Sequence, residues 1–139
     1  MRNILLVALL FSMNTQAIDL ILGGISHHIG QKRYPDKGRR VRYNSQHKMR
    51  GIGFKYGDYY LSAINYTNSF YTESTAVSVQ YEYKGFYIGG TVANGYDQWN
   101  LSNLGKLTAY PSIRYPFKYG SIVMMGAAVA GIISIPIEL

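Results

Sequence analysis

Alternation of apolar and polar residues between positions 49 and 96 is the feature that most constrains the fold of this chain. From residue 76 to residue 83, Ala, Ser, Gln and Glu alternate with Val and Tyr. A period of two places successive side chains on opposite faces of a β-strand. Gly57-Asp58 and Lys84-Gly85 are tight turns between such segments, and a longer connection separates the two turns. This order predicts an antiparallel meander with short turns at one end and longer loops at the other.

The same pattern continues along the chain and predicts eight strands. They cover residues 19–28, 49–56, 59–67, 74–83, 86–94, 106–117, 121–128 and 132–139. Residues 29–48 are expected to be a long loop, and a small-residue loop at Ala130-Gly131 would separate the last two strands. Pro111 and Pro116 cannot donate ladder hydrogen bonds, so we expect the sixth strand to be bulged or bent. The predicted fold class is all-β: an eight-stranded antiparallel up-and-down β-barrel of the outer-membrane type, in one domain spanning residues 18–139.

The first seventeen residues have the features of an export signal. Arg2 supplies a positive charge, residues 4–11 form an apolar run, and Thr15 and Ala17 suit a cleavage site after Ala17. The apolar run is too short to cross a bilayer as a helix. Residues 1–17 are therefore predicted to be a cleaved signal peptide that exports the chain to the outer membrane, with an uncleaved anchor as the alternative.

The direction of the alternation is left open by the sequence. A membrane barrel turns its apolar residues outward, whereas a soluble lipocalin-like barrel in the periplasm would turn them inward with the same period. A third short turn is predicted at Lys118-Tyr119-Gly120. Tyrosines beside the three short turns favour the membrane barrel, because an interfacial aromatic girdle would lie there. These tyrosines are Tyr56, Tyr59, Tyr60, Tyr83, Tyr87 and Tyr119.

Positive charge is concentrated in and around the predicted loop that follows the first strand. Eight Lys or Arg residues lie between positions 32 and 50, and Asp36 is the one acid among them. A basic loop attracts polyanions, and for an exported protein we expect the phosphates of lipopolysaccharide rather than nucleic acid. Arg39, Arg40 and Arg42 are the predicted contacts, with a surface receptor protein as another partner considered. The alternative is that the basic segment is only a solvated loop. The protein itself is expected to be monomeric.

Polar residues that flank the long loops define a candidate site at one rim of the predicted barrel. Ester hydrolysis or acyl transfer on outer-leaflet lipid would require a Ser hydroxyl beside a base, with a group that orients the base. The candidate catalytic residues are His28, Ser69, Ser74 and Glu73, and the candidate ligand-binding residues at this rim are Asn44, His47 and Asn68.

Each candidate has a role in this hypothesis. His28, or else His47, would be the base for Ser69 or Ser74. Glu73 would orient the histidine, and Asn68 would donate to an oxyanion. In the alternative the same residues form loop turns and a solvated rim, so the residue types do not decide whether the protein is an enzyme. No cysteine is present and no carboxylate cluster accompanies the histidines, so neither a metal nor another cofactor is expected.

Several short motifs lie at the same rim of the predicted barrel. They are Ser26-His27-His28, Tyr43-Asn44 before Gly51-Ile52-Gly53, and Tyr66-Thr67-Asn68-Ser69 with Ser74 following. They resemble a family of small exported proteins of phages, prophages and Gram-negative bacteria that have no assigned activity. The resemblance implies a small β-barrel, and the fold alone is similar to small barrels that deacylate or palmitoylate lipid A. The predicted function is surface interaction or envelope modification, with lipid A-directed ester hydrolysis or acyl transfer as the alternative.

Overall fold

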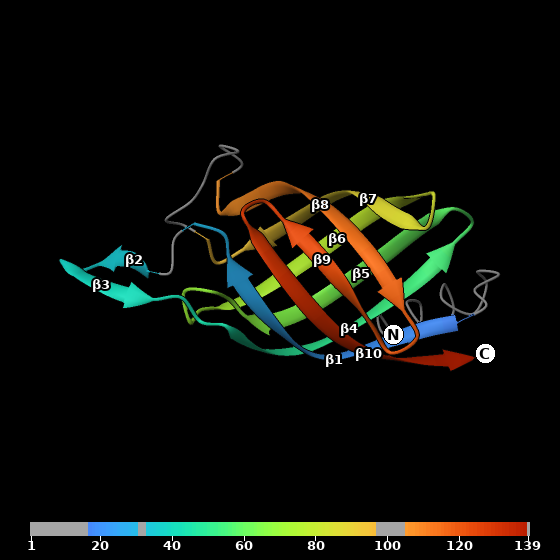
Figure 1. Cartoon of the computed structure of the whole chain (residues 1–139), viewed down its shortest axis with the longest axis horizontal. Coiled ribbons are helices and arrows are strands. Elements are labelled where there is room, and N and C mark those ends of the chain that lie inside the picture. The colour runs from blue at the N-terminus through green and yellow to red at the C-terminus, as the bar shows by residue number, and fades with distance from the viewer. Residues whose placement is uncertain (1–16, 31–32, 97–104, 139) are drawn as a thin grey trace, which may run out of the picture.

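The computed structural model describes residues 17–30, 33–96 and 105–138, which form a closed antiparallel barrel with a small hairpin beside it (Figure 1). The predicted eight-stranded barrel is confirmed. Its strands are β1 (Ala17–His28), β4 (Gln46–Tyr56), β5 (Tyr59–Thr67), β6 (Glu73–Tyr83), β7 (Phe86–Asn94), β8 (Leu107–Phe117), β9 (Gly120–Met125) and β10 (Ala128–Glu138). Neighbours in sequence pair along the wall, and β1 closes the ring by pairing with β10 as well as β4.

The N-terminal prediction falls mostly outside this description. Of the predicted signal peptide, residues 1–17, only Ala17 is described, as the first residue of β1. Among the described residues, no helix has the length and apolar character needed to span a membrane.

The apolar side of the alternation faces outward. In β6, Val77 and Val79 are 53% and 48% exposed, whereas Ser78 and Gln80 between and beside them are buried. Exposed large apolar side chains come from all eight wall strands. The barrel therefore has an apolar exterior and places many of its polar side chains inside, because a period of two separates the two kinds of residue.

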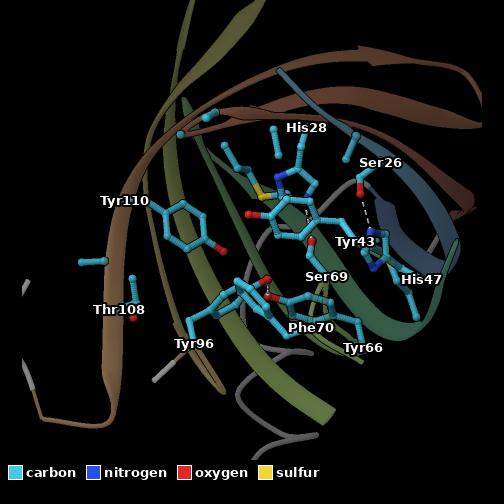
Figure 2. Close-up of a pocket in the computed structure, with 17 residues that line it drawn as sticks. Ser26, His28, Tyr43, His47, Tyr66, Ser69, Phe70, Tyr96, Thr108 and Tyr110 are labelled. Atoms are coloured by element: carbon cyan, nitrogen blue, oxygen red, sulfur yellow. Dashed lines mark hydrogen bonds between the residues drawn. The ribbon is translucent and has the colours of Figure 1, made fainter. Parts of the chain in front are cut away.

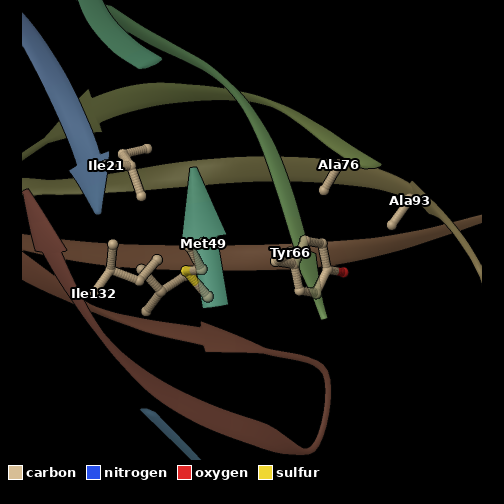
Figure 3. Close-up of a cluster of buried hydrophobic side chains, with 7 residues drawn as sticks. Ile21, Met49, Tyr66, Ala76, Ala93 and Ile132 are labelled. Atoms are coloured by element: carbon tan, nitrogen blue, oxygen red, sulfur yellow. The ribbon is translucent and has the colours of Figure 1, made fainter. Parts of the chain in front are cut away.

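The barrel interior has an apolar part and a polar part. The apolar cluster comprises Ile21, Met49, Tyr66, Ala76, Ala93, Val123 and Ile132 (Figure 3). Nearer the short turns, the buried Arg114 donates to Gln80 Oε1 at 3.2 Å and to Ser121 Oγ at 2.8 Å. Its guanidinium also lies 4.6 Å from the centre of the Tyr60 ring. No buried side-chain nitrogen or oxygen among the described residues lacks a hydrogen-bond partner, in keeping with the general rule that buried polar groups are paired.

A bulge or bend was expected in β8 because of its two prolines, but the register shift in the barrel wall lies in β1. The register shifts in β1 between Ile21 and Gly23, while the β8 pairings run without a shift. Pro111 lies one residue beyond the last β8–β9 pair, and Pro116 lies two residues beyond the last β7–β8 pair. Each missing N–H therefore falls past the end of a ladder and leaves no gap in it.

Two further expectations about the wall were wrong. The last turn is at Gly126-Ala127, with Gly126 at a φ of +54°, and Ala130-Gly131 lies within β10. Tyr60 and Tyr87 are buried inside the barrel and do not belong to an outer girdle. Each of these two tyrosines follows an outward-facing residue directly after a short turn, so the period of two directs it inward.

The first long connection contains a hairpin, although a loop without regular structure was predicted. Its strands are β2 (Arg33–Asp36) and β3 (Arg39–Arg42), and they pair in register. Lys37 and Gly38 both have positive φ, +44° and +78°, which matches the type I′ turn that favours two-residue hairpins. Figure 1 shows this hairpin projecting beyond the long-loop end of the barrel.

Candidate functional site

A cavity of about 250 Å³ lies inside the long-loop end of the barrel (Figure 2). Aromatic rings, methionines and small residues form most of its lining, including Tyr66, Phe70, Tyr96, Tyr110 and Met49. The polar lining is confined to a few side chains, of which Ser26, His28, His47 and Ser69 carry nucleophilic or basic groups. An apolar cavity with a few convergent polar groups is the usual form of a small-ligand site.

The first Ser–His pair joins two neighbouring wall strands. Ser26 Oγ on β1 lies 2.6 Å from His47 Nε2 on β4, and His47 Nδ1 lies 2.7 Å from the Thr67 carbonyl oxygen. A carbonyl can only accept, so Nδ1 carries the proton and Nε2 of the neutral ring accepts from the Ser26 hydroxyl. His47 is therefore a base that is already aimed at a serine and held in one orientation by the backbone of β5.

The second Ser–His pair connects the wall to the loop after β5. His28 Nε2 lies 2.8 Å from Ser69 Oγ. The His28 ring stacks on Tyr43 with 4.0 Å between ring centres and 18° between planes. Tyr43 in turn contacts Phe70 and Tyr34, so the His28 orientation depends on an aromatic cluster at the mouth of the barrel.

Asn68 holds the loop after β5 in place. It is fully buried, and its Oδ1 accepts from the backbone N–H groups of Phe70 at 2.8 Å and Thr72 at 3.0 Å. Its Nδ2 donates to Ser74 Oγ at 2.9 Å and to the Gly95 carbonyl at 2.7 Å. Both amide hydrogens are thus committed within the protein, which leaves none for the oxyanion role suggested by the sequence.

Asn44 has the same scaffolding character in the first long connection. Its Nδ2 donates to the Asn68 carbonyl at 3.2 Å, and its Oδ1 accepts from Gln46 N at 3.1 Å. Its backbone N–H donates to the Ser69 carbonyl at 2.8 Å. These bonds tie the first two long connections together above the cavity.

The remaining predicted residues lie away from a histidine or away from the cavity. Glu73 is exposed and its Oε1 accepts from Thr67 Oγ1 at 2.7 Å, so it does not orient either histidine. Ser74 is bonded to Asn68. Arg39, Arg40 and Arg42 are in β3 of the projecting hairpin, and none of them lines the cavity.

Ser26 is the residue that the sequence reasoning did not assign to catalysis. It precedes two histidines, but its partner His47 is 21 positions away. The sequence contained one indication of this pair: Ser26 and His47 flank the same long connection, at the ends of two strands that pair with each other. The register that places Gly24 opposite His47 then brings the Ser26 side chain to the imidazole.

Burial also raises the pKa of two tyrosines that lie outside the barrel strands, Tyr43 and Tyr96. It raises the pKa of the Tyr43 phenol, and together with the neighbouring Tyr110 it raises the pKa of Tyr96. The shift keeps both hydroxyls protonated well above neutral pH, and the Tyr96 hydroxyl lies 2.7 Å from the Tyr66 hydroxyl. Among the described residues, no group of three or more His, Asp or Glu side chains is placed to hold a metal ion.

No protein-family model matches this chain, and no curated protein matches it in sequence. The fold and the site thus define a class only: a closed eight-stranded barrel with two Ser–His pairs at an apolar internal cavity. The resemblance to small exported phage and bacterial proteins stays a prediction, and the function is inferred from geometry.

Proposed function

We propose that this protein is an exported outer-membrane barrel that cleaves or transfers an acyl ester of a membrane lipid, with Ser26 as the nucleophile and His47 as the base. One observation carries the proposal: Ser26 Oγ is 2.6 Å from a His47 ring whose other nitrogen is held by the Thr67 carbonyl. This pair lines an apolar cavity suited to hydrocarbon. Such chemistry would be one form of the envelope modification predicted from the sequence.

The chemistry follows from the arrangement of the pair. As Ser26 Oγ attacks the ester carbonyl carbon, His47 Nε2 takes the hydroxyl proton. When the tetrahedral intermediate collapses, the C–O bond to the alcohol breaks and His47 returns the proton to the leaving oxygen. Water or a second alcohol then attacks the acyl-serine by the reverse proton path. The Thr67 carbonyl keeps the ring in the reactive tautomer, the role that a carboxylate has in a Ser-His-Asp triad.

The location in a membrane is supported by the exterior of the barrel. Apolar side chains that are 38–66% exposed occur on every wall strand, and proteins in water rarely expose apolar surface that continues around the whole molecule. Near the short turns, the outward aromatics include Tyr56, Tyr83, Phe86, Phe117 and Tyr119. A soluble periplasmic barrel would need the opposite orientation of the alternation, so the outer membrane is the better proposal.

The test uses the full chain, folded in a zwitterionic detergent, with p-nitrophenyl octanoate as the substrate. Ser26→Ala and His47→Ala should each lower the turnover rate by about a hundredfold or more, because either change removes the nucleophile–base pair. Ser78→Ala is the matched control, since this buried serine bonds to Thr91 at 2.7 Å and does not line the cavity. Heat-modifiable gel migration verifies that each variant is folded.

Two outcomes would contradict the proposal. Turnover that survives both Ser26→Ala and His47→Ala would remove this pair from the chemistry. Loss on Ser69→Ala with full activity in Ser26→Ala would transfer the role to the His28–Ser69 pair, the one predicted from the sequence.

In cells, the masses of lipid A with and without the protein should differ by one acyl group if lipid A is the substrate.

Surface binding through the β2–β3 hairpin is the second candidate function. The observation that favours it is that all four described arginines of the hairpin are exposed. Lipopolysaccharide phosphates would be the partner in that case.

A further inference from the structure

The β2–β3 hairpin has two faces with different chemistry. In an antiparallel pair, residues directly opposite each other project to the same face. Arg33 lies opposite Arg42, and Pro35 lies opposite Arg40. One face therefore carries Arg33, Arg40 and Arg42. The other face carries Tyr34 opposite Val41, and Asp36 opposite Arg39.

The second face is fixed against the barrel mouth by aromatic contacts. Tyr34 is only 4% exposed. Its ring meets Phe70 edge-on at 4.7 Å and lies 5.1 Å from the Tyr43 ring. Tyr43 then stacks on His28 at the cavity. The three-arginine face is thus turned away from the aromatic cluster. The contacts between these rings link the orientation of the hairpin to the candidate site.

The charges on the arginine face have no acidic partner among the described residues. Like charges directly opposite each other destabilise an antiparallel pair, and Arg33 faces Arg42 in this way. The one ion pair among the described residues, Lys55–Glu82, is on the barrel wall. Arg39 differs from the other three arginines because Asp36 lies across from it. An external anion would relieve the repulsion on the arginine face, and the planar guanidinium fork is well matched to phosphate oxygens.

We propose that the face formed by Arg33, Arg40 and Arg42 binds the phosphate of a membrane-lipid headgroup. The inference deepens the proposed function and rests on it for the membrane setting, and it names the substrate class as lipids with phosphorylated headgroups. The hairpin projects beyond the rim of the barrel (Figure 1), so its arginines would meet headgroups while the cavity below receives an acyl chain. Compared with the phosphate contacts predicted from the sequence, this set includes Arg33 and omits Arg39.

The experiment measures binding by calorimetry with the folded full chain in zwitterionic detergent. The probes are short-chain phosphatidic acid, phosphatidylcholine with the same chains, and inorganic phosphate. The wild-type protein should prefer phosphatidic acid over phosphatidylcholine by about tenfold or more, as charge-assisted bonds to an exposed phosphate predict. The triple variant R33Q/R40Q/R42Q should lose this preference. Arg39→Gln, which removes one positive charge from the other face, should retain it to within about twofold.

Three results would overturn the inference: a preference that survives the triple variant, an equal loss in Arg39→Gln, or equally tight binding of inorganic phosphate, which would indicate a free-anion site. Turnover of p-nitrophenyl octanoate in the same samples separates this inference from the proposed function. A wild-type protein that prefers phosphatidic acid but hydrolyses no ester would refute the catalytic proposal and leave the phosphate site standing.

Discussion

Ser26 Oγ and His47 Nε2 lie 2.6 Å apart across two neighbouring strands, and the Thr67 carbonyl on the next strand holds the other side of the imidazole. Three consecutive wall strands, β1, β4 and β5, therefore contribute one group each. Hydrogen-bonded ladders fix the distances between these strands, so the pair is preorganised without a flexible loop. The second pair, His28 with Ser69, depends on a loop and on ring stacking, and this difference leads to the first prediction.

His28→Ala should affect substrate binding more than the chemical step. The change removes the stacking partner of Tyr43 and the bond to Ser69, both at the mouth of the cavity. We expect KM to rise by about three- to tenfold while kcat changes by less than about threefold. Steady-state kinetics with p-nitrophenyl octanoate measures both. A kcat that falls as far as in His47→Ala would show that His28 acts in the chemistry.

Asn68→Ala should destabilise the site far more than a surface asparagine change. The substitution leaves the buried Ser74 Oγ without its partner, and it also removes the part-buried bonds to the Gly95 carbonyl and to two backbone N–H groups. The expected cost is about 2–4 kcal/mol of unfolding free energy. The control Asn65→Ala, at an exposed wall position bonded to Thr75, should change stability by about 0.5 kcal/mol or less. Urea unfolding followed by gel mobility compares the two variants.

Val79→Arg tests whether the barrel wall meets lipid. Val79 is an outward residue in the middle of β6, opposite Leu61 and Gly90 on its neighbours. In a bilayer this arginine should cost about 2–4 kcal/mol, and in water the effect should be close to zero. Ile29→Arg, at an exposed position past the end of β1, is the control and should be tolerated in both settings. Equal stability of the two variants in phospholipid vesicles would argue against a lipid-facing wall.

The adjacent glycines of β7 should respond differently to alanine. A Cβ on Gly89 would collide with the Val79 carbonyl oxygen and lie 2.7 Å from Gln80 Cα, both of them backbone atoms of β6. A Cβ on Gly90 would have Tyr110 O as its nearest neighbour, at 3.9 Å. Gly89→Ala should therefore cost about 1–3 kcal/mol of unfolding free energy, and Gly90→Ala should be neutral or slightly stabilising. Parallel urea titrations would reveal the difference, and similar midpoints would contradict it.

Part of the site was predictable and part was not. His28 and Ser69 were both selected from the sequence, and the structure joins them. Glu73 was expected to orient a histidine, yet its side chain is exposed and bonds to Thr67. Alternation explains this result: Ser74 is buried, so the preceding residue of the same strand faces out.

The sequence by itself determined the number of wall strands, the three short turns and the concentration of arginines after the first strand, because period and turn chemistry are local properties. Only the tertiary structure decided which face of the alternation points outward and that Ser26 meets His47. It also decided which arginines share a face of the hairpin. These outcomes depend on the closure of the barrel and on the register between paired strands. Register is a relation between segments, and the β1–β4 register spans a connection whose residues do not encode it.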